Sequence, residues 1–176
     1  MLKKEYRQQI IQEQSFYDTS FRARVLKYDS FYIGKYLKSL RWAEWYDMKT
    51  GILSKMQCAV YKYRLRKFGK MFGFQIGLHT CGFGLRFYHW GTIIINKNAK
   101  IGRGGVIYPG VTIGQTSHGK VPVIGDNVFI GLGAKVFGDI KIGNNVIIAP
   151  NAIVVKDVPD NAVVGGIPAK VIKFVE

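Results

Sequence analysis

The chain has few of the features that mark secreted or membrane-spanning proteins. Only 2 of its 176 residues are cysteines, too few for a disulfide framework, so we expect both to be reduced thiols. No run approaches the roughly 18 consecutive apolar residues that a membrane-spanning helix needs. The N-terminal residues lead into polar sequence without the apolar core of a signal peptide. We therefore expect a cytoplasmic protein.

Glycine and proline are scarce in the first part of the chain. Of its 21 glycines, 19 lie from Gly69 onward, and residues 1–70 contain no proline. This imbalance predicts a boundary between a basic, aromatic-rich helical region over residues 1–75 and a second domain over residues 76–176. The spacing of apolar residues predicts helices around residues 3–14, 31–46 and 52–68.

Acidic residues are also few, with 11 Asp and Glu against 26 Lys and Arg and a net charge of +15. Residues 1–80 hold 16 basic and 6 acidic residues, a net of +10, so most of the excess lies there. The charges could be the solvated face of packed helices, or they could contact an anionic membrane surface at the inner face of the membrane. No nucleic-acid partner is expected, since no recognition motif accompanies the charge.

The most informative feature present is a six-residue repeat. Its aliphatic positions are Ile95, Ile101, Ile107, Ile113, Ile124, Ile130, Val136, Ile142, Ile148 and Val154. A period of six fits neither an α-helix nor simple strand alternation, but it fits a parallel β-helix in which each side points one aliphatic residue to the axis. The small residue at the fifth place of each hexad is expected at a tight corner. Gly or Asn, such as Asn127, Asn144 and Asn145, would adopt positive φ there.

The repeat resembles that of the hexapeptide-repeat acyltransferases. The segment Gly165-Gly166-Ile167-Pro168-Ala169-Lys170 is similar to the Gly-x-Pro-Ala-Lys/Arg closing motif of that family. The resemblance covers residues from about 76 to 173. It implies a mainly β fold, a left-handed parallel β-helix after an N-terminal α-helical segment, although the general rule for crossovers would favour the right-handed form. It also implies a homotrimer and acetyl-CoA as the donor substrate.

The candidate general base is His89. Six positions before Ile95, the repeat reaches His89, a titratable residue where an aliphatic one is expected. From position alone, a partly exposed histidine in a frayed first coil is an equal alternative. The segment is also similar to one in serine acetyltransferases in which a histidine before a glycine and an aliphatic run is the general base. An imidazole with a pKa near 6.5 can take a hydroxyl proton and pass it to the leaving CoA thiolate, by direct transfer.

The repeat is interrupted between Ile113 and Ile124, a step of eleven residues. The five extra residues predict an extruded loop over residues 114–123, and such loops often carry function. Serine acetyltransferases have a loop at the same place with a second histidine, so His118 is a further catalytic candidate. The third histidine, His79, is expected to be structural.

The resemblance also supplies candidates for binding acetyl-CoA, which the family holds in a groove between neighbouring β-helices. By position these are Gly114, Gln115, Gly131, Leu132, Ala149 and Pro150, with Lys156, Lys170 and Lys173 for the 3′-phosphate. Each lysine could equally be a solvated surface residue. A phosphate favours such charge-assisted contacts.

Two departures bear on the acceptor. Serine acetyltransferases have Asp before the catalytic histidine, where this chain has Tyr88, and a second Asp where it has Phe74. Residues 82–92 look more like serine-acetyltransferase-like enzymes of surface-polysaccharide pathways. We therefore predict a sugar or polysaccharide precursor as acceptor, contacted by Arg86, Tyr88 and Trp90, with L-serine as the alternative.

Other functions fit the sequence less well. A non-catalytic binding or scaffold protein would need neither His89 nor the extruded loop. The γ-type carbonic anhydrase, a zinc enzyme on the same fold, needs three converging histidines. The three histidines here are ten and twenty-nine residues apart, so no metal is expected.

Overall fold

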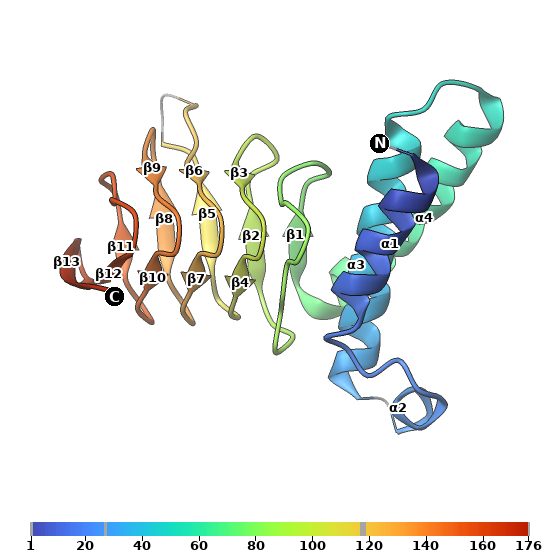
Figure 1. Ribbon diagram of the computed structural model, residues 1–176, viewed down its shortest axis with the longest axis horizontal. Coiled ribbons are helices and arrows are strands. Elements are labelled where there is room, and N and C mark those ends of the chain that lie inside the picture. Colours follow the sequence, from blue (N-terminus) through green and yellow to red (C-terminus); the bar gives the residue numbers. More distant parts are fainter. Residues whose placement is uncertain (1, 27, 117–118, 176) are drawn as a thin grey trace. The chain divides into compact units, whose positions relative to one another are not determined.

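The computed structural model describes residues 2–26, 28–116 and 119–175. The chain divides into two compact units, Met1–Phe74 and Gln75–Glu176. The first is helical and the second is built from short strands, as Figure 1 shows.

The helical unit contains α1 (Lys3–Gln14), α2 (Phe21–Val25), α3 (Asp29–Asp47) and α4 (Ile52–Phe72). The three predicted helices are confirmed, whereas the five-residue α2 was not predicted. Helix α3 packs against α4, and α1 and α2 pack on α3. Within the described residues, no helix is both long enough and apolar enough to cross a lipid bilayer.

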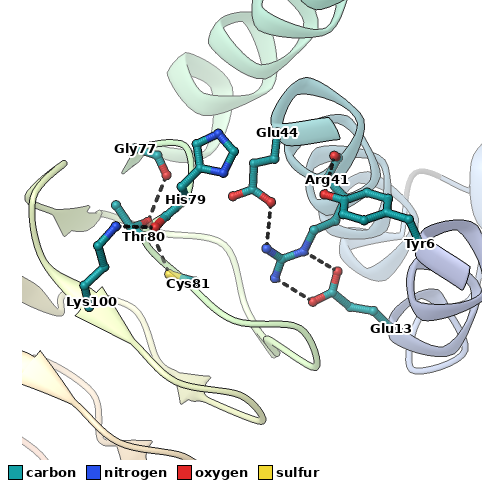
Figure 2. Close-up of polar contacts among 9 residues, drawn as sticks. All are labelled: Tyr6, Glu13, Arg41, Glu44, Gly77, His79, Thr80, Cys81 and Lys100. Atoms are coloured by element: carbon teal, nitrogen blue, oxygen red, sulfur yellow. Dashed lines mark hydrogen bonds and ion pairs between the residues drawn. The ribbon is translucent and has the colours of Figure 1, made fainter. Parts of the chain in front are cut away.

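The centre of the helical unit holds a buried charge network (Figure 2). Arg41 is 1% exposed and donates hydrogen bonds to both carboxylate oxygens of Glu13 and to Glu44, each 2.9 Å long. The hydroxyl of Tyr6 donates to the carbonyl of Arg41 at 2.7 Å. Burial by itself would lower the pKa of the Arg41 guanidinium. The carboxylates of Glu13 and Glu44 outweigh this effect and raise that pKa. The network therefore ties α1 to α3 through fully satisfied charges.

The second unit is a three-sided parallel β-helix. Its strands are β1 (Phe74–Ile76), β2 (Ile93–Ile95), β3 (Lys100–Ile101), β4 (Val106–Ile107), β5 (Thr112–Gly114), β6 (Val123–Ile124), β7 (Phe129–Ile130), β8 (Lys135–Phe137), β9 (Lys141–Ile142), β10 (Ile147–Ile148), β11 (Ile153–Val154), β12 (Ala162–Gly166) and β13 (Ala169–Phe174). The first sheet has the order β1-β2-β5-β8-β11, the second β13-β12-β10-β7-β4 and the third β3-β6-β9. Only β12 and β13 pair in antiparallel fashion among the pairs described.

The strand register follows the hexads. Ile95 lies over Ile113 and Ile113 over Val136, and each of the three is at most 4% exposed. The predicted stack of aliphatic residues along the axis is therefore confirmed. Burying these side chains removes apolar surface from water, at roughly 25 cal/mol per Å², and supplies the core of the unit.

The corners differ in detail from the prediction. The fifth residue of each hexad points inward and is buried, as Ala99 and Val128 are at no more than 1% exposed. The positive φ belongs to the fourth place, as at Gly133, Asn127 and Asn145. Asn144 lies one place earlier and its side chain instead accepts a hydrogen bond from the backbone N–H of Asp126. Asparagine tolerates the left-handed conformation, so it can turn each corner while the next residue enters the core.

Candidate active site at the His89 corner

His89 lies in a turn that is two residues longer than its equivalents. Strand pairing places Arg86 beside Val106, a step of twenty residues, and Ile94 beside Thr112, a step of eighteen. The two extra residues therefore lie between Arg86 and Ile94, in the turn that carries His89. An extended turn on a rigid coil can project side chains from the surface.

The expectation that His89 takes an inward aliphatic place is wrong. Arg86 pairs with Val106, so Phe87 lies over Ile107, and Phe87 is 1% exposed. His89 is exposed instead. The apolar Phe87 gains more from burial than an imidazole would, since a buried polar ring needs a hydrogen-bond partner.

Tyr108 connects the imidazole to further aromatic side chains. The ring of His89 lies 6.2 Å from that of Tyr108, which contacts Tyr88 at 5.6 Å and Phe129 at 5.3 Å between centroids. Tyr88 is 52% exposed and Trp90 is 55% exposed, so both predicted acceptor contacts are available to a ligand. Sequence reasoning missed Tyr108 and Phe129. A signal existed, because Tyr108 follows an aliphatic position where five other hexads have glycine.

The His89 turn is stacked on further turns of the same corner. The carbonyl of Thr92 accepts a hydrogen bond from the backbone N–H of Gly110 at 2.6 Å. The N–H of Gly133 donates to Pro109, and that of Asn151 donates to Leu132, at 2.9 and 2.8 Å. We call this column the His89 corner; it comprises residues 88–92, 108–110, 131–133 and 149–151.

The structure brings four predicted acetyl-CoA contacts onto the His89 corner. These are Gly131, Leu132, Ala149 and Pro150. A side chain at Gly131 would meet the backbone N of Pro150 at 2.7 Å, so glycine is required for the turns to stack this closely. Leu132 is 51% exposed and offers an apolar surface beside them.

Three other predicted contacts lie on a different corner. Gly114 ends β5, Gln115 follows it, and Lys156 follows β11, so all three leave strands of the first sheet at the end opposite to the His89 corner. The amide of Asn96 donates to Oε1 of Gln115 at 3.2 Å. We call this the loop corner; it comprises residues 96–98, 114–116, 119–122, 137–139 and 155–157. The first sheet separates it from the His89 corner.

The remaining predicted residues lie on or beside the second sheet. Lys170 and Lys173 are exposed on β13, paired with Gly165 and Val163 of β12. Arg86 is half-buried at the position that precedes Phe87. Neither lysine belongs to the His89 corner or to the loop corner.

The interruption of the repeat is an extruded segment. Ile101 lies over Ile124, a step of twenty-three residues, so the five extra residues leave the coil between β5 and β6. Lys120 forms an ion pair with Asp139 across the loop corner, and this hydrogen bond raises the pKa of the lysine. The predicted catalytic candidate His118 lies outside the described residues.

His79 lies in the same coil as His89 but at a different corner, in the turn that follows β1. It has a positive φ of 60°, and its carbonyl accepts a hydrogen bond from Lys100 at 2.9 Å, as Figure 2 shows. Cys58 and Cys81 are both buried free thiols, and Cys81 contacts the hydroxyl of Thr80. In the part of the chain that the structure describes, no three His, Cys, Asp or Glu side chains gather to hold a metal ion.

Comparisons with known proteins agree with this architecture. The family described as bacterial transferase hexapeptide (six repeats) matches residues 122–156. The serine acetyltransferase of Mycobacterium tuberculosis is 47% identical over 83 residues, which are 46% of this chain and 36% of that protein. This chain thus spans little more than a third of the length of that relative.

Two solved structures resemble the chain over almost its whole length. Serine acetyltransferase from Brucella abortus in complex with coenzyme A is 27% identical with a TM-score of 0.72, covering 96% of this chain and 67% of that one. Serine acetyltransferase from Neisseria gonorrhoeae in complex with serine is 25% identical with a TM-score of 0.70, covering 97% and 70%.

The prediction of a sugar or polysaccharide acceptor is contradicted by these relatives. Proteins up to 47% identical to this chain are serine acetyltransferases, and they support the alternative acceptor, L-serine. The sugar prediction rested on Tyr88 and Phe74 in place of two acids and on the look of residues 82–92, and these features do not identify a sugar acceptor. The chain has the left-handed parallel β-helix of the hexapeptide-repeat transferases and is similar to the serine acetyltransferases among them.

Proposed function

We propose that this protein transfers an acetyl group from acetyl-CoA to the hydroxyl of L-serine, with His89 as the general base. The observation that carries the proposal is the exposed imidazole of His89 in an extended turn, stacked on turns that offer backbone and apolar surface to a ligand. The resemblance to serine acetyltransferases supports the donor and the acceptor.

The chemistry needs few groups. A serine hydroxyl is a poor nucleophile until its proton is removed, and a neutral imidazole can accept that proton as the oxygen attacks the thioester carbonyl. The imidazolium then gives the proton to the departing CoA sulfur, so the base is regenerated. Backbone N–H groups can stabilise the oxyanion of the tetrahedral intermediate. No covalent enzyme intermediate is required, and neither buried thiol is used.

The division of the predicted donor site between two corners supports a homotrimer. In one copy, Gly131 and Leu132 lie with His89, while Gly114 and Gln115 lie across the first sheet. In a closed ring of three copies, each contact joins two different surfaces, so one copy's His89 corner would meet the next copy's loop corner. We propose that acetyl-CoA lies in the three grooves formed in this way.

The aromatic setting of His89 suggests how serine is held. The resemblance places Asp where this chain has Tyr88, so a carboxylate is replaced by an exposed phenol ring. Tyr88 and Trp90 offer aromatic faces that can attract the ammonium group of serine. We therefore propose weaker binding of serine than a carboxylate would give.

The test is release of CoA thiol from acetyl-CoA by the purified protein, with L-serine, D-serine and L-alanine as acceptors. The proposal expects thiol release with L-serine above the acceptor-free rate, none with L-alanine, and O-acetylserine as the product by mass spectrometry. If the folded protein released thiol at the same rate with L-alanine as with L-serine, the serine hydroxyl would not be the acceptor.

A further inference from the structure

The helical unit contains a groove lined by elements of all four helices. It consists of two adjoining cavities of about 810 and 780 Å³. Both cavities include Thr19, Lys35, Lys38 and Tyr61, so these residues mark the place where they meet. Volumes of this size are those of small-molecule sites in proteins. We call it the basic groove.

The charge of the basic groove is entirely of one sign. The first cavity is lined by Arg24, Arg64 and Lys67 in addition to the shared Lys35 and Lys38, and the second adds Lys3 and Arg7. None of the described residues that line either cavity is acidic. Seven cations facing one concave surface repel one another, and an anion bound among them would relieve that repulsion.

The two central lysines are available to such an anion. Lys35 and Lys38 are exposed one turn apart on α3, and neither forms an ion pair with any described residue. The Nζ atom of Lys35 lies 5.2 Å from the centre of the Phe31 ring. This contact orients the side chain, and its N–H donors are not used on any carboxylate of the described residues. Two neighbouring ammonium groups suit a phosphate, which can accept from both.

One cavity wall is aromatic. Trp42, Tyr46 and Tyr61 stack on one another, with ring centroids 5.8 to 6.3 Å apart and interplanar angles of 13° to 27°. All three line the second cavity and are half-buried. Rings held in place by each other can receive a flat or apolar group with little loss of entropy.

A buried donor also lies in this wall. The Nε2 atom of Gln14 on α1 is buried and donates to no atom in the described part of the chain, and Gln14 lines the second cavity. A buried amide donor without a partner costs free energy, and a bound acceptor would recover it. This observation is independent of the charge.

A second copy of the chain is a poor occupant for the same groove. In a two-fold contact the same surface of both copies would meet, and seven cations would face seven cations. Such like-charge contacts disfavour association. A ligand with at least two negative charges would instead be attracted to the groove.

We propose that the basic groove binds a phosphate-bearing organic ligand. The phosphate groups lie between Lys35 and Lys38, and the organic part lies on Trp42, Tyr46 and Tyr61, within reach of the Gln14 amide. The same phosphate chemistry is found in soluble metabolites and in lipid headgroups, and the experiment separates these two sources. The proposal concerns the helical unit alone and does not depend on acetyl transfer.

The test is isothermal titration calorimetry of the full chain with inorganic pyrophosphate and with uridine diphosphate. We expect uridine diphosphate to bind more tightly than pyrophosphate. The variant Lys35→Gln/Lys38→Gln should bind both at least about tenfold more weakly, since each lost charged hydrogen bond is costly. Lys55→Gln/Lys70→Gln on α4 removes the same charge outside the groove and should bind within about twofold of the parent.

Two further variants separate the walls of the groove. Gln14→Glu should weaken the binding of both ligands, because it replaces a donor by a negative charge. Trp42→Leu should weaken the binding of uridine diphosphate but leave that of pyrophosphate unchanged. The melting temperature of this variant is measured to check that it is folded. Equal weakening in the two lysine double variants would overturn the proposal, since it would mean general attraction to a basic protein.

The lipid source is tested by co-sedimentation with vesicles that contain phosphatidic acid. Vesicle binding that is lost in Lys35→Gln/Lys38→Gln, without binding of either soluble ligand, would support the phosphate site with a lipid headgroup as its ligand. Vesicle binding unaffected by that variant, or no binding of any of the three probes, would overturn the proposal.

Discussion

A Cβ atom added at Gly91 would lie 2.8 Å from the Cβ atom of Pro109, in the turn two residues after His89. Gly91 also has a φ of +146°, which L side chains rarely adopt. Gly91→Ala should therefore push the His89 turn away from the turn beneath it. We expect kcat to fall by about 10- to 100-fold, because small displacements of a catalytic group are costly.

The matched control for Gly91 is Gly51→Ala. Gly51 has a φ of +107°, and an added Cβ would meet nothing within 4 Å. It should reproduce the backbone strain, of about 1–2 kcal/mol, without displacing His89. Steady-state rates and melting temperatures of both variants check this. Equal activity of the two variants would show that the contact with Pro109 does not position the base.

The general base can be tested directly. His89→Ala should lower turnover with L-serine by roughly 10²- to 10⁴-fold, the usual contribution of a general base, and leave melting temperature and oligomeric state unchanged. His79→Asn is the matched control, since asparagine tolerates the positive φ of that residue. Full activity of His89→Ala would place the base elsewhere, with His118 the next candidate.

The hexad pattern was enough to predict most of the core of the β-helix but not its first coil. The axis residues from Ile95 onward are predicted by ten aliphatic positions at a spacing of six, with one interruption between Ile113 and Ile124. Counting back reached His89 because the pattern cannot detect an insertion before its first member, and Phe87 fits the inward position better. His89 was predicted as the general base mainly through the resemblance of its segment to the family motif rather than through its position.

Features that depend on tertiary packing were missed for a different reason. The basic groove combines residues of all four helices, including the five-residue α2, which is too short to show a periodic pattern. Tyr108 reaches the His89 corner only because two turns of the coil are stacked. For the residues of the basic groove, which come from separate helices, the sequence separation carries no sign of proximity.

The role of Tyr88 predicts a gain of affinity on substitution. Tyr88→Asp restores the acid that the resemblance places before the catalytic histidine, and a carboxylate attracts the ammonium of serine more strongly than an aromatic face does. We expect KM for L-serine to fall by about tenfold with kcat changed less. Tyr88→Leu, which removes the ring without adding charge, should raise KM. A rise of KM in both variants would show that the phenol itself is needed.

Recognition of the 3′-phosphate can be tested by comparing the parent and a lysine variant with two donors, one with this phosphate and one without it. If Lys170 and Lys173 bind this phosphate, as the resemblance predicts, Lys170→Gln/Lys173→Gln should raise KM for acetyl-CoA about tenfold with little change in kcat. The same variant should then show no such rise with 3′-dephospho-acetyl-CoA, which lacks that group. Lys141→Gln, on the third sheet, serves as the control. Equal effects on the two donors would mean that the lysines act elsewhere.

The buried network in the helical unit makes a prediction about stability. Arg41→Met leaves Glu13 and Glu44 buried without their partner, and breaking a buried pair in this way costs about 3–5 kcal/mol. Replacing all three with apolar residues, as Arg41→Met/Glu13→Leu/Glu44→Leu, removes every charge and should recover most of that loss, because the desolvation penalty disappears with the ions. Urea unfolding of both variants checks this. If the triple variant were as unstable as the single one, the three charged side chains would be needed for the packing of α1 on α3, and not only to pair with one another.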